Sequence, residues 1–523
     1  MKHKAEELAK EQREISVSEF FEKNRHLLGF DNPLRALSTT VKELVDNSLD
    51  ACEEMGVLPD IKIEIKQLGE TRFTISVLDN GPGVVKEQIP KVFAKLLYGS
   101  KFGKMKQSRG QQGIGVSASV LYGQLTTGKP AIITSKIGKN QPAHHYYLKI
   151  DILKNEPLIV KDDVVDFGLD NGTKVEIELE GKYQKGKQGV EEYVRQTAIA
   201  NPHANVIFIG PDKEKIIFKR VVEKLPKEPK SIKPHPYGVE VGILLRMAHQ
   251  SKARNLQGFL AGEFSRISTN LAKQICEKAK VDFNIKPKEF NHNQADALIK
   301  AIRETRVMSP PLDCLSPIGE KAIIEGLKKE LKGDFYTAVT RRPSVYRGFP
   351  FQVEVGLIYG GELLSDELIK VVRLANKVPL QYQQGACAIT KSIIQTSWRN
   401  YGLSQSKGAM PAGPIYLLVH IASVWVPFTS EAKEAIAHYP EIIKQLKLAL
   451  QDAGRKLGSY IRKTVKTKEQ QERVSLFEKY IPELASSLSS LTGDKKDIIE
   501  VNLNKIFKKN LKEILPNDQN SEK

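Results

Sequence analysis

An acidic residue and an amide stand one helical turn apart in the segment Glu43-Leu-Val-Asp-Asn47-Ser-Leu-Asp50. On a helix, Glu43 and Asn47 project from the same face, and Asp50 follows a further turn along. An asparagine side-chain oxygen can ligate Mg²⁺, while a neighbouring carboxylate can orient and deprotonate a water molecule. The same pattern also suits a solvated helix face. The segment therefore indicates metal-assisted water chemistry only in combination with other motifs.

A second motif, Asp79-Asn-Gly81-Pro-Gly83, directly follows a segment that alternates apolar and polar residues. A carboxylate at the end of a strand can accept a hydrogen bond from an amino group, such as the exocyclic amine of adenine. The two glycines let a ligand approach the backbone closely. Taken alone, the motif is better explained as a plain Asp-Asn-Gly turn.

A glycine-rich tract runs from Ser108 to Val116, with Gly110, Gly113 and Gly115 inside it, and Tyr98-Gly-Ser100-Lys101 precedes it. Glycines at the start of a helix expose backbone N–H groups at its positive end, where phosphates bind. The spacing differs from the Rossmann fingerprint, and the chain has no P-loop, protein-kinase catalytic loop or nucleophile elbow. The tract predicts a phosphate site of another class.

The elements that must position these motifs follow from the hydrophobic pattern. Residues 16–55 are predicted to be helical with a break at Asn32-Pro33, and their apolar face consists of Leu37, Val41, Leu44, Val45 and Leu49. A helix should also follow the glycine-rich tract as far as Tyr122. Alternating patterns predict strands at 61–66, 72–78, 131–136, 145–151, 173–179 and 205–209. This order is typical of an α+β sandwich with helices on one side of a mixed sheet, ending near residue 225.

The remainder of the chain divides by composition. Residues 225–238 hold four prolines and form a predicted linker. Residues 239–310 carry only helical signals. Strands are expected again at 351–359, 369–375 and 415–426, and a long amphipathic helix at 431–465.

Length and composition limit the class of protein. A chain of 523 residues should form two to four domains. Of its net charge of +18, residues 201–350 carry most, with 27 basic and 16 acidic side chains. Such a region either binds nucleic acid or forms a Lys-rich surface exposed to solvent. Four cysteines without a Cys-x-x-Cys pair exclude a disulfide framework and indicate a reducing compartment, which we take to be the cytoplasm. No segment has the features of a signal peptide or a membrane span.

Taken together with Gly172-Thr173 at the start of a later strand, the three motifs resemble those of the GHKL ATPases, which include gyrase and histidine kinases. The resemblance implies the GHKL (Bergerat) ATP-binding sandwich, with ATP and Mg²⁺ as ligands. It implies that Glu43 is the general base, Asn47 the magnesium ligand and Asp79 the carboxylate that binds adenine. The other implied ATP contacts are Gly81 and Gly83 beneath the base, Thr173, Ser100, Lys101, and the lid residues Gly110, Gln111, Gln112, Gly113, Ile114, Gly115 and Val116.

Longer stretches are similar to the B subunits of archaeal type IIB DNA topoisomerases. These are LYGSKFGKMKQSRGQQGIGVSA at 97–118, the linker end KPHPYG, LDCLSPIGE at 312–320, RRPSVYRGFPFQVEVGLIYGG at 341–361 and RLANKVPLQY at 373–382. The similarity implies four parts: a strap and ATPase domain (1–228), a helix–two-turn–helix domain (229–312), a transducer domain with a mixed sheet and a long C-terminal helix (313–470), and a helical tail (471–523).

The same resemblance implies an ATP-dependent type II topoisomerase. Lys433, expected at the start of the long helix, would contact the terminal phosphate. Two copies would dimerise on ATP and capture double-stranded DNA. A separate A subunit would cleave the DNA within an A2B2 assembly, since this chain has no Asp-x-Asp pair to hold a cleavage metal. One departure is Ser117, which stands where the family often has a lysine, so a charge is lost beside the lid.

Three alternatives remain: a GHKL chaperone-type clamp that acts on proteins, a mismatch-repair-like ATPase, and a non-enzymatic DNA-binding module. The absence of DNA-stimulated ATPase activity would favour the first. The central helical region disfavours the second, and loss of turnover with intact ATP binding in Glu43→Ala would exclude the third.

Overall fold

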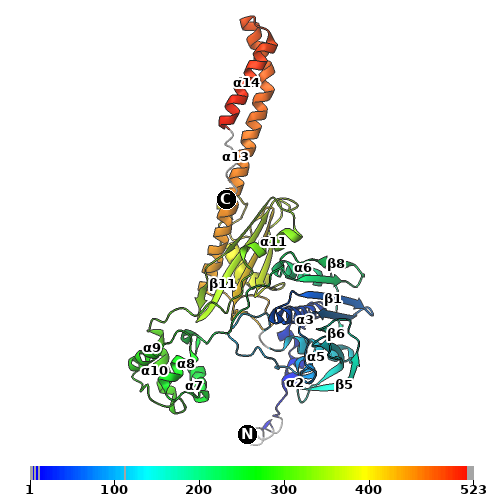
Figure 1. Cartoon of the computed structure of the whole chain (residues 1–523), viewed down its shortest axis with the longest axis vertical. Coiled ribbons are helices and arrows are strands. Elements are labelled where there is room, and N and C mark those ends of the chain that lie inside the picture. Colours follow the sequence, from blue (N-terminus) through cyan, green and yellow to red (C-terminus); the bar gives the residue numbers. More distant parts are fainter. Residues whose placement is uncertain (1–3, 5–7, 10–11, 111–112, 515–523) are drawn as a thin grey trace. The chain divides into compact units, whose positions relative to one another are not determined.

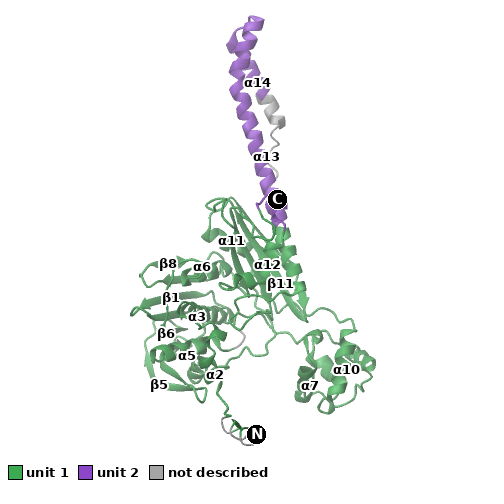
Figure 2. Cartoon of the chain, turned by 180° about the vertical axis from the view of Figure 1, so that it is seen from behind, with its two compact units in different colours: residues 1–396, 405–453 green, residues 397–404, 454–523 purple. Residues whose placement is uncertain are grey.

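The computed structural model describes residues 4, 8–9, 12–110 and 113–514 (Figure 1). The chain forms two compact units, one of residues 1–396 and 405–453 and the other of residues 397–404 and 454–523 (Figure 2). Among the described residues, no helix combines the length and the apolar character needed to cross a membrane.

An eight-stranded sheet in the first unit has the strand order β5-β4-β3-β6-β2-β1-β7-β8. Neighbouring strands are antiparallel except β1 and β7, which are parallel, so the sheet is mixed as expected. The strands are β1 (Asp60–Gln67), β2 (Arg72–Asp79), β3 (Ala131–Lys136), β4 (Ala143–Asp151), β5 (Glu156–Val165), β6 (Gly172–Glu180), β7 (Asn205–Ile209) and β8 (Lys215–Phe218).

Helices α3 (Pro33–Met55) and α5 (Gly115–Thr127) pack against this sheet (Figure 1). Helix α3 begins at the predicted break, because the Asn32 side chain accepts a hydrogen bond from the Arg35 amide and Pro33 occupies the first turn. Its predicted apolar face is fully buried in the core, which confirms the α+β sandwich. Shorter helices complete this part of the unit: α2 (Val17–Lys23), α4 (Ile89–Ala94) and α6 (Val190–Ala200).

Two strands of this sheet, β5 and β8, were not predicted from the pattern. Both lie at sheet edges. Most side chains of β5 are exposed, so its sequence EPLIVKDDVV lacks the alternation that marks a half-buried strand. Hydrogen bonding to β4 rather than burial determines its conformation.

The middle of the chain is helical, as predicted, and residues 239–310 contain no strand in this fully described stretch. The helices are α7 (Val241–Gln250), α8 (Leu256–Glu263), α9 (Thr269–Ala279) and α10 (His292–Arg303). They enclose a core of their own, which includes Leu244, Phe259, Phe290 and Leu298.

A second, six-stranded sheet follows, with the order β10-β11-β14-β12-β13 and with β9 also paired to β11. The predicted strands correspond to β11 (Phe349–Tyr359), β12 (Lys370–Ala375) and β14 (Ile415–Ser423). Helix α11 (Glu320–Glu330), which packs on this sheet, was not predicted. The remaining elements are β9 (Phe335–Thr340), β10 (Ser344–Tyr346), β13 (Val378–Pro379) and α12 (Ala388–Ile394).

The long helix α13 (Pro440–Thr492) starts nine residues later than predicted and extends further. The prediction of a start at residue 431 is wrong because the chain first forms a tight turn, in which Phe428 and Ile436 form a β-bridge. The Thr429 amide donates to the Ala435 carbonyl across this turn. Lys433 therefore lies in a loop and does not open a helix.

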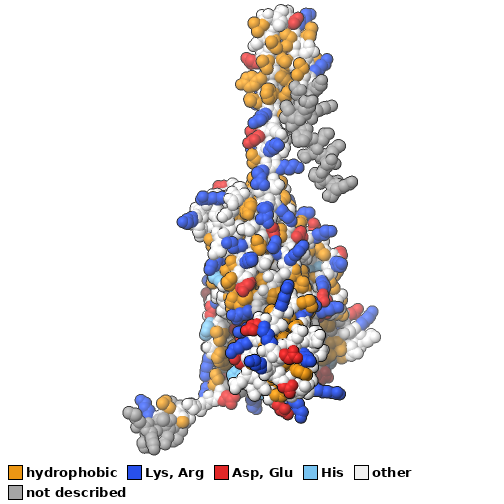
Figure 3. All heavy atoms as spheres, turned by 90° about the vertical axis from the view of Figure 1, so that its left-hand side faces the viewer, with side chains coloured by type: hydrophobic (Ala, Val, Ile, Leu, Met, Phe, Trp, Pro, Cys, Tyr) orange, Lys and Arg blue, Asp and Glu red, His pale blue; other side chains and the backbone are white. Residues whose placement is uncertain are grey.

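The second unit holds the distal part of α13 together with α14 (Lys496–Ile514). The rings of Phe477 and Phe507 lie 6.2 Å apart between these two helices. Apolar side chains also gather on the surface of this pair (Figure 3), among them Leu476, Tyr480, Leu484 and Leu491.

Lys329 on α11 provides a test of packing between α11 and the first sheet. Its ammonium group lies 5.9 Å from the centre of the Phe218 ring and has no hydrogen-bond partner among the described residues. Burial lowers the pKa of Lys329 to about 8, although Glu330 opposes the shift. The folded state therefore binds this proton more weakly than the unfolded state does.

We expect Lys329→Met to raise the free energy of unfolding by about 1 kcal/mol at pH 7. In the unmodified chain, the free energy of unfolding should rise with pH between the folded pKa of Lys329, about 8, and the unfolded value of 10.5. The advantage of Lys329→Met over the unmodified chain should therefore shrink across that window and vanish above it. Thermal melting at a series of pH values measures this. The matched control is Lys328→Met at the neighbouring exposed lysine, which should show neither effect.

Candidate functional site

A cavity of about 290 Å³ lies among α3, α5 and the 431–433 loop. Most of the predicted site residues line it: Glu43, Asn47, Asp79, Ser100, Lys101, Gly110, Gly113, Ile114, Gly115, Val116, Thr173 and Lys433. Gly81 and Gly83 do not line it, and Gln111 and Gln112 lie outside the described residues. Motifs that are far apart in the sequence, such as those of Glu43 and Lys433, thus meet in one place.

Helix α3 presents Glu43 and Asn47 to the cavity from successive turns. The Glu43 carboxylate packs against the backbone of Gly115, where an added methyl group would come within 1.8 Å of Oε2. A methyl group on Gly110 would lie 3.6 Å from Asn47 Oδ1. Gly115 therefore makes room for the Glu43 carboxylate, whereas at Gly110 a methyl group would be in ordinary van der Waals contact with Asn47.

Asp79 ends β2 at the cavity wall and is buried. Its Oδ2 accepts a hydrogen bond from the Ser48 hydroxyl (2.9 Å), and its Oδ1 accepts from the amides of Gly81 (2.9 Å) and Thr173 (3.2 Å). Burial raises the pKa of Asp79, and these hydrogen bonds oppose the rise. Since Oδ2 has a single donor, it retains a lone pair that can accept from a ligand amine.

Thr173 is held by a residue that sequence reasoning missed. Its hydroxyl lies 2.9 Å from that of Ser135 on β3, and Ser135 Oγ also accepts from the Val84 amide at 2.8 Å. Ser48 was missed as well, although its position next to Asn47 on α3 was a usable signal. Ser48 thus holds the Asp79 carboxylate, and Ser135 holds the Thr173 hydroxyl beside it.

The two glycines after Asp79 shape the turn instead of lining the cavity. The Gly81 amide binds Asp79, as described above. Gly83 has φ +71°, and a side chain there would meet the Lys136 carbonyl oxygen at 2.2 Å. Only glycine fits at this close approach of the turn to β3.

Helix α5 begins at Gly115, and the side chain of its N-cap residue, Ile114, forms no capping hydrogen bond. Its first turn lines the cavity, so the positive end of the helix dipole is available to an anion. The Ser117 hydroxyl donates to the Ile114 carbonyl oxygen at 3.0 Å, within the helix. Ser117 therefore brings to the cavity wall a hydroxyl that is already bound to the backbone, and no positive charge.

Lys433 reaches the cavity from a loop in which its own φ is +55°. Burial lowers the pKa of its ammonium group, and the nearby Glu43 opposes that shift. The next residue, Glu434, forms an ion pair with Arg35 of α3, which anchors the loop to the helix that carries Glu43. The Lys433 ammonium group is thus held at the cavity by a loop that is anchored to α3.

Lys101 lines the cavity, but its ammonium group is paired with Asp50 at 2.5 Å. Asp50 is buried and does not line the cavity. It also accepts from Arg109 at 2.7 Å, and Arg109 was not predicted as a site residue. Asp50 therefore orients the Lys101 and Arg109 side chains from outside the cavity lining.

The donor set fits a nucleotide and a divalent cation. An acceptor for an amine, an uncapped helix start and a lysine surround one cavity of suitable size. Among the described residues, no group of three His, Cys, Asp or Glu side chains could hold a metal. Asn47 brings an amide oxygen to the cavity one turn along α3 from Glu43, so a cation bound to it would need phosphate oxygens and water as further ligands.

Comparison with protein families gives two matches. Residues 35–166 match the family of histidine kinase-, DNA gyrase B- and HSP90-like ATPases. Residues 310–473 match the topoisomerase VI B subunit transducer family. The first region contains Glu43, Asn47, Asp79 and the glycine-rich tract, and it supports a nucleotide-binding role for the cavity.

Three relatives are similar over most of this chain. The B subunit of type 2 DNA topoisomerase 6 from Methanococcoides burtonii is 51% identical over 94% of this chain and 80% of its own length. That from Archaeoglobus fulgidus is 48% identical over 92% and 79%. That from Pyrococcus horikoshii is 40% identical over 95% of each chain.

Proposed function

Because the chain belongs to the family of type 2 DNA topoisomerase 6 B subunits, we propose that it binds ATP and Mg²⁺ in this cavity and hydrolyses the ATP to drive DNA strand passage. The main support is the meeting of three groups in one cavity: the Asp79 carboxylate, the uncapped start of α5 and the Glu43 carboxylate. They suit adenine, the phosphates and an attacking water, respectively.

In this proposal each residue has a separate task. Asp79 Oδ2 accepts from the adenine amine, while Thr173 and the Gly81-Gly83 turn hold Asp79 in place. The amides of the 113–116 segment bind phosphate oxygens, and Ser100 and Lys101 lie beside them. Mg²⁺, bound through Asn47 Oδ1, would neutralise phosphate charge.

Glu43 removes a proton from the attacking water as that water adds to the terminal phosphate. Lys433, which lines the cavity, stabilises the charge on the terminal phosphate. Since the Lys433 loop leads directly into α13, the presence of that phosphate can bias the position of the helix. Hydrolysis then releases this contact.

The division of the chain into functional parts is also a proposal. We assign residues 1–228 to the strap and ATPase domain, 229–312 to a helix–two-turn–helix domain, 313–470 to the transducer and 471–523 to a helical tail. The four cysteines are free and buried, which suits a reducing compartment such as the cytoplasm.

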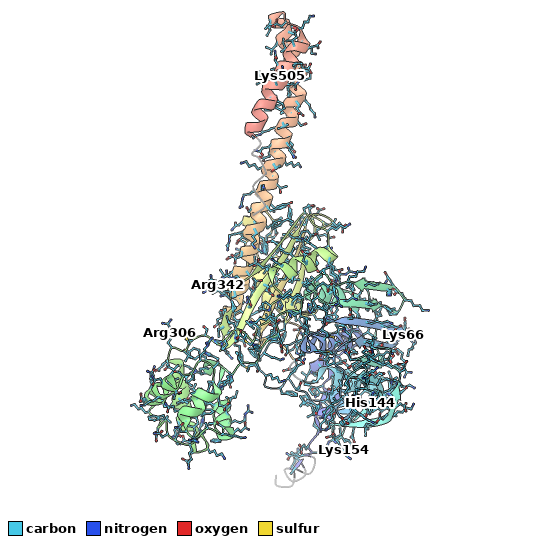
Figure 4. The ribbon with its side chains drawn as sticks, in the orientation of Figure 1. Lys66, His144, Lys154, Arg306, Arg342 and Lys505 are labelled. Atoms are coloured by element: carbon cyan, nitrogen blue, oxygen red, sulfur yellow. The ribbon has the colours of Figure 1, made fainter. Side chains whose placement is uncertain are left out.

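Double-stranded DNA is the proposed substrate, and a separate A subunit is the proposed partner that cleaves it. The helical domain exposes basic side chains at Lys252, Arg254, Arg266, Lys273, Lys278 and Lys280. Further exposed arginines follow, including Arg306 and Arg342 (Figure 4). If these residues contact phosphates, neutralising those at 252–280 should weaken DNA binding and reduce its salt dependence.

ATP-driven dimerisation gives the proposed function its direct test. A non-hydrolysable ATP analogue should convert the chain from monomer to dimer in light scattering, and the chain with its A subunit should relax supercoiled DNA only when ATP is present. Failure to dimerise would contradict the proposed gate. Relaxation by the chain alone would contradict the division of labour. ATPase activity that DNA does not stimulate would favour the chaperone-type alternative.

A further inference from the structure

The segment 105–109, which leads into the lid, is bonded to the first residues of the transducer and to the linker before the helical domain. Met105 forms a β-bridge with Ile232, and the Gln107 amide donates to the Cys314 carbonyl oxygen at 2.9 Å. The Gln107 side chain both donates to the Ser316 carbonyl (3.0 Å) and accepts from its amide (2.7 Å). Gln107 and Ser316 are 209 positions apart in the sequence, so the segment is tied to a distant part of the chain.

The Asn376 side chain extends this connection to the centre of the transducer sheet. Its Nδ2 donates to the Ser108 carbonyl (3.0 Å) and to the Ser423 carbonyl (3.0 Å), while its Oδ1 accepts from the Ser423 amide (2.9 Å). Ser423 ends β14. Thus a single buried amide joins the backbone just before the lid to a central strand.

Arg109 forms the other side of the connection. It is 7% exposed and binds both carboxylate oxygens of Glu53, at 2.6 and 3.1 Å, in addition to Asp50. Burial alone would raise the pKa of Glu53, but Arg109 and then Lys377 outweigh it and hold that pKa well below its usual range. The carboxylate therefore stays charged between the two basic side chains.

Lys377 joins this ion cluster to the transducer. Its ammonium group lies 3.9 Å from Glu53 and donates to the Ser316 hydroxyl at 3.2 Å. Its amide donates to His420 Nε2 at 3.0 Å, so the His420 ring hydrogen is on Nδ1, which donates to Glu354 at 2.8 Å. Both His420 and Glu354 are fully buried, and they fix the backbone of Lys377 to β14 and β11.

The turn that carries Asn376 and Lys377 holds both in the left-handed backbone region, with φ of +49° and +68°. This conformation is costly for residues other than glycine and persists where surrounding contacts determine it. It brings the Asn376 amide to the lid side and the Lys377 ammonium to Glu53. Neither side chain lines the nucleotide cavity.

We propose that Asn376 and Lys377 are positioning residues that couple the nucleotide site to the transducer. When ATP binds, segment 105–109 shifts, and two routes pass this shift to β12 and β14. One route runs from the Ser108 carbonyl to Asn376. The other runs from Arg109 through Glu53 to Lys377. This link acts beside the contact that Lys433 makes, and it rests on the proposed ATP-driven cycle. Buried polar groups with several hydrogen bonds each suit such a task, because these bonds strengthen one another and tend to change together.

The test compares Lys377→Met with the unmodified chain, each assembled with its A subunit, and measures ATP hydrolysis and DNA relaxation in the same sample. We expect KM for ATP to change by less than about twofold, while the DNA relaxed per ATP hydrolysed falls roughly tenfold. Lys377→Arg retains the charge and should restore most of the coupling. In Asn376→Gly, glycine tolerates the positive φ at this position, and the loss of the side chain should lower the DNA relaxed per ATP in the same way. This variant replaces Lys377→Met in the test if Lys377→Met does not fold.

Lys329→Met is the matched control, since it removes another lysine packed between the transducer and the ATPase part without touching segment 105–109. It should leave the ratio of relaxation to hydrolysis unchanged. A parallel loss of hydrolysis and relaxation in Lys377→Met and Asn376→Gly, or no loss in either activity, would overturn the link. An unmodified complex without ATP-dependent relaxation would instead overturn the proposed function.

Discussion

Glu43→Gln should lower ATP turnover by roughly 10²- to 10⁴-fold and leave nucleotide binding intact. The amide keeps the shape of the side chain against Gly115, but it cannot accept a proton from the attacking water. The groups proposed to hold adenine and the phosphates, including Asp79 and the start of α5, are unchanged. Steady-state ATPase kinetics and titration with a non-hydrolysable analogue measure the two effects separately.

The matched control for this experiment is Glu54→Gln. Glu54 is also on α3, but it is exposed, pairs with Lys106 at 3.4 Å and does not line the cavity. Its replacement should leave turnover within about twofold. Full activity in Glu43→Gln would remove Glu43 as the general base. Loss of analogue binding would show instead that the carboxylate organises the site.

The parts of the site that could be predicted are those that depend on local geometry. Helical periodicity places Glu43 and Asn47 on one face, and an alternating strand ends at Asp79, so sequence spacing was sufficient for both. The resemblance supplied the remaining step, that distant motifs meet around one ligand. All of them except Gly81, Gly83 and the two undescribed glutamines line the cavity.

Other features depend on contacts between distant segments and left no local signal. Nothing around Asn376 indicates that its amide bonds to Ser108, 268 residues away. The 431–439 stretch has an amphipathic pattern, so periodicity predicted helix there. The bridge between Phe428 and Ile436 instead closes a turn and delays the helix to Pro440. Tertiary hydrogen bonds decided the structure in both places.

Asp79→Asn should weaken binding of an ATP analogue by at least about 100-fold while leaving the fold intact. In the variant, the amide oxygen can keep the two hydrogen bonds from the Gly81 and Thr173 amides. The new NH₂ group can donate to the Ser48 hydroxyl, which rotates to accept. The buried network is therefore preserved, so thermal melting should change little.

The group presented to the ligand is nevertheless reversed. Where Asp79 Oδ2 offers a lone pair to the adenine amine, the variant offers an N–H, and two donors then face each other in a buried site. A nucleotide with a carbonyl in place of that amine, such as an inosine triphosphate analogue, should lose much less affinity and should bind the variant better than ATP does. Calorimetric titration of both nucleotides against both proteins measures this exchange of preference. Binding of the ATP analogue within about threefold of the unmodified chain would show that Asp79 does not read the base, because a merely structural carboxylate would not distinguish the two nucleotides.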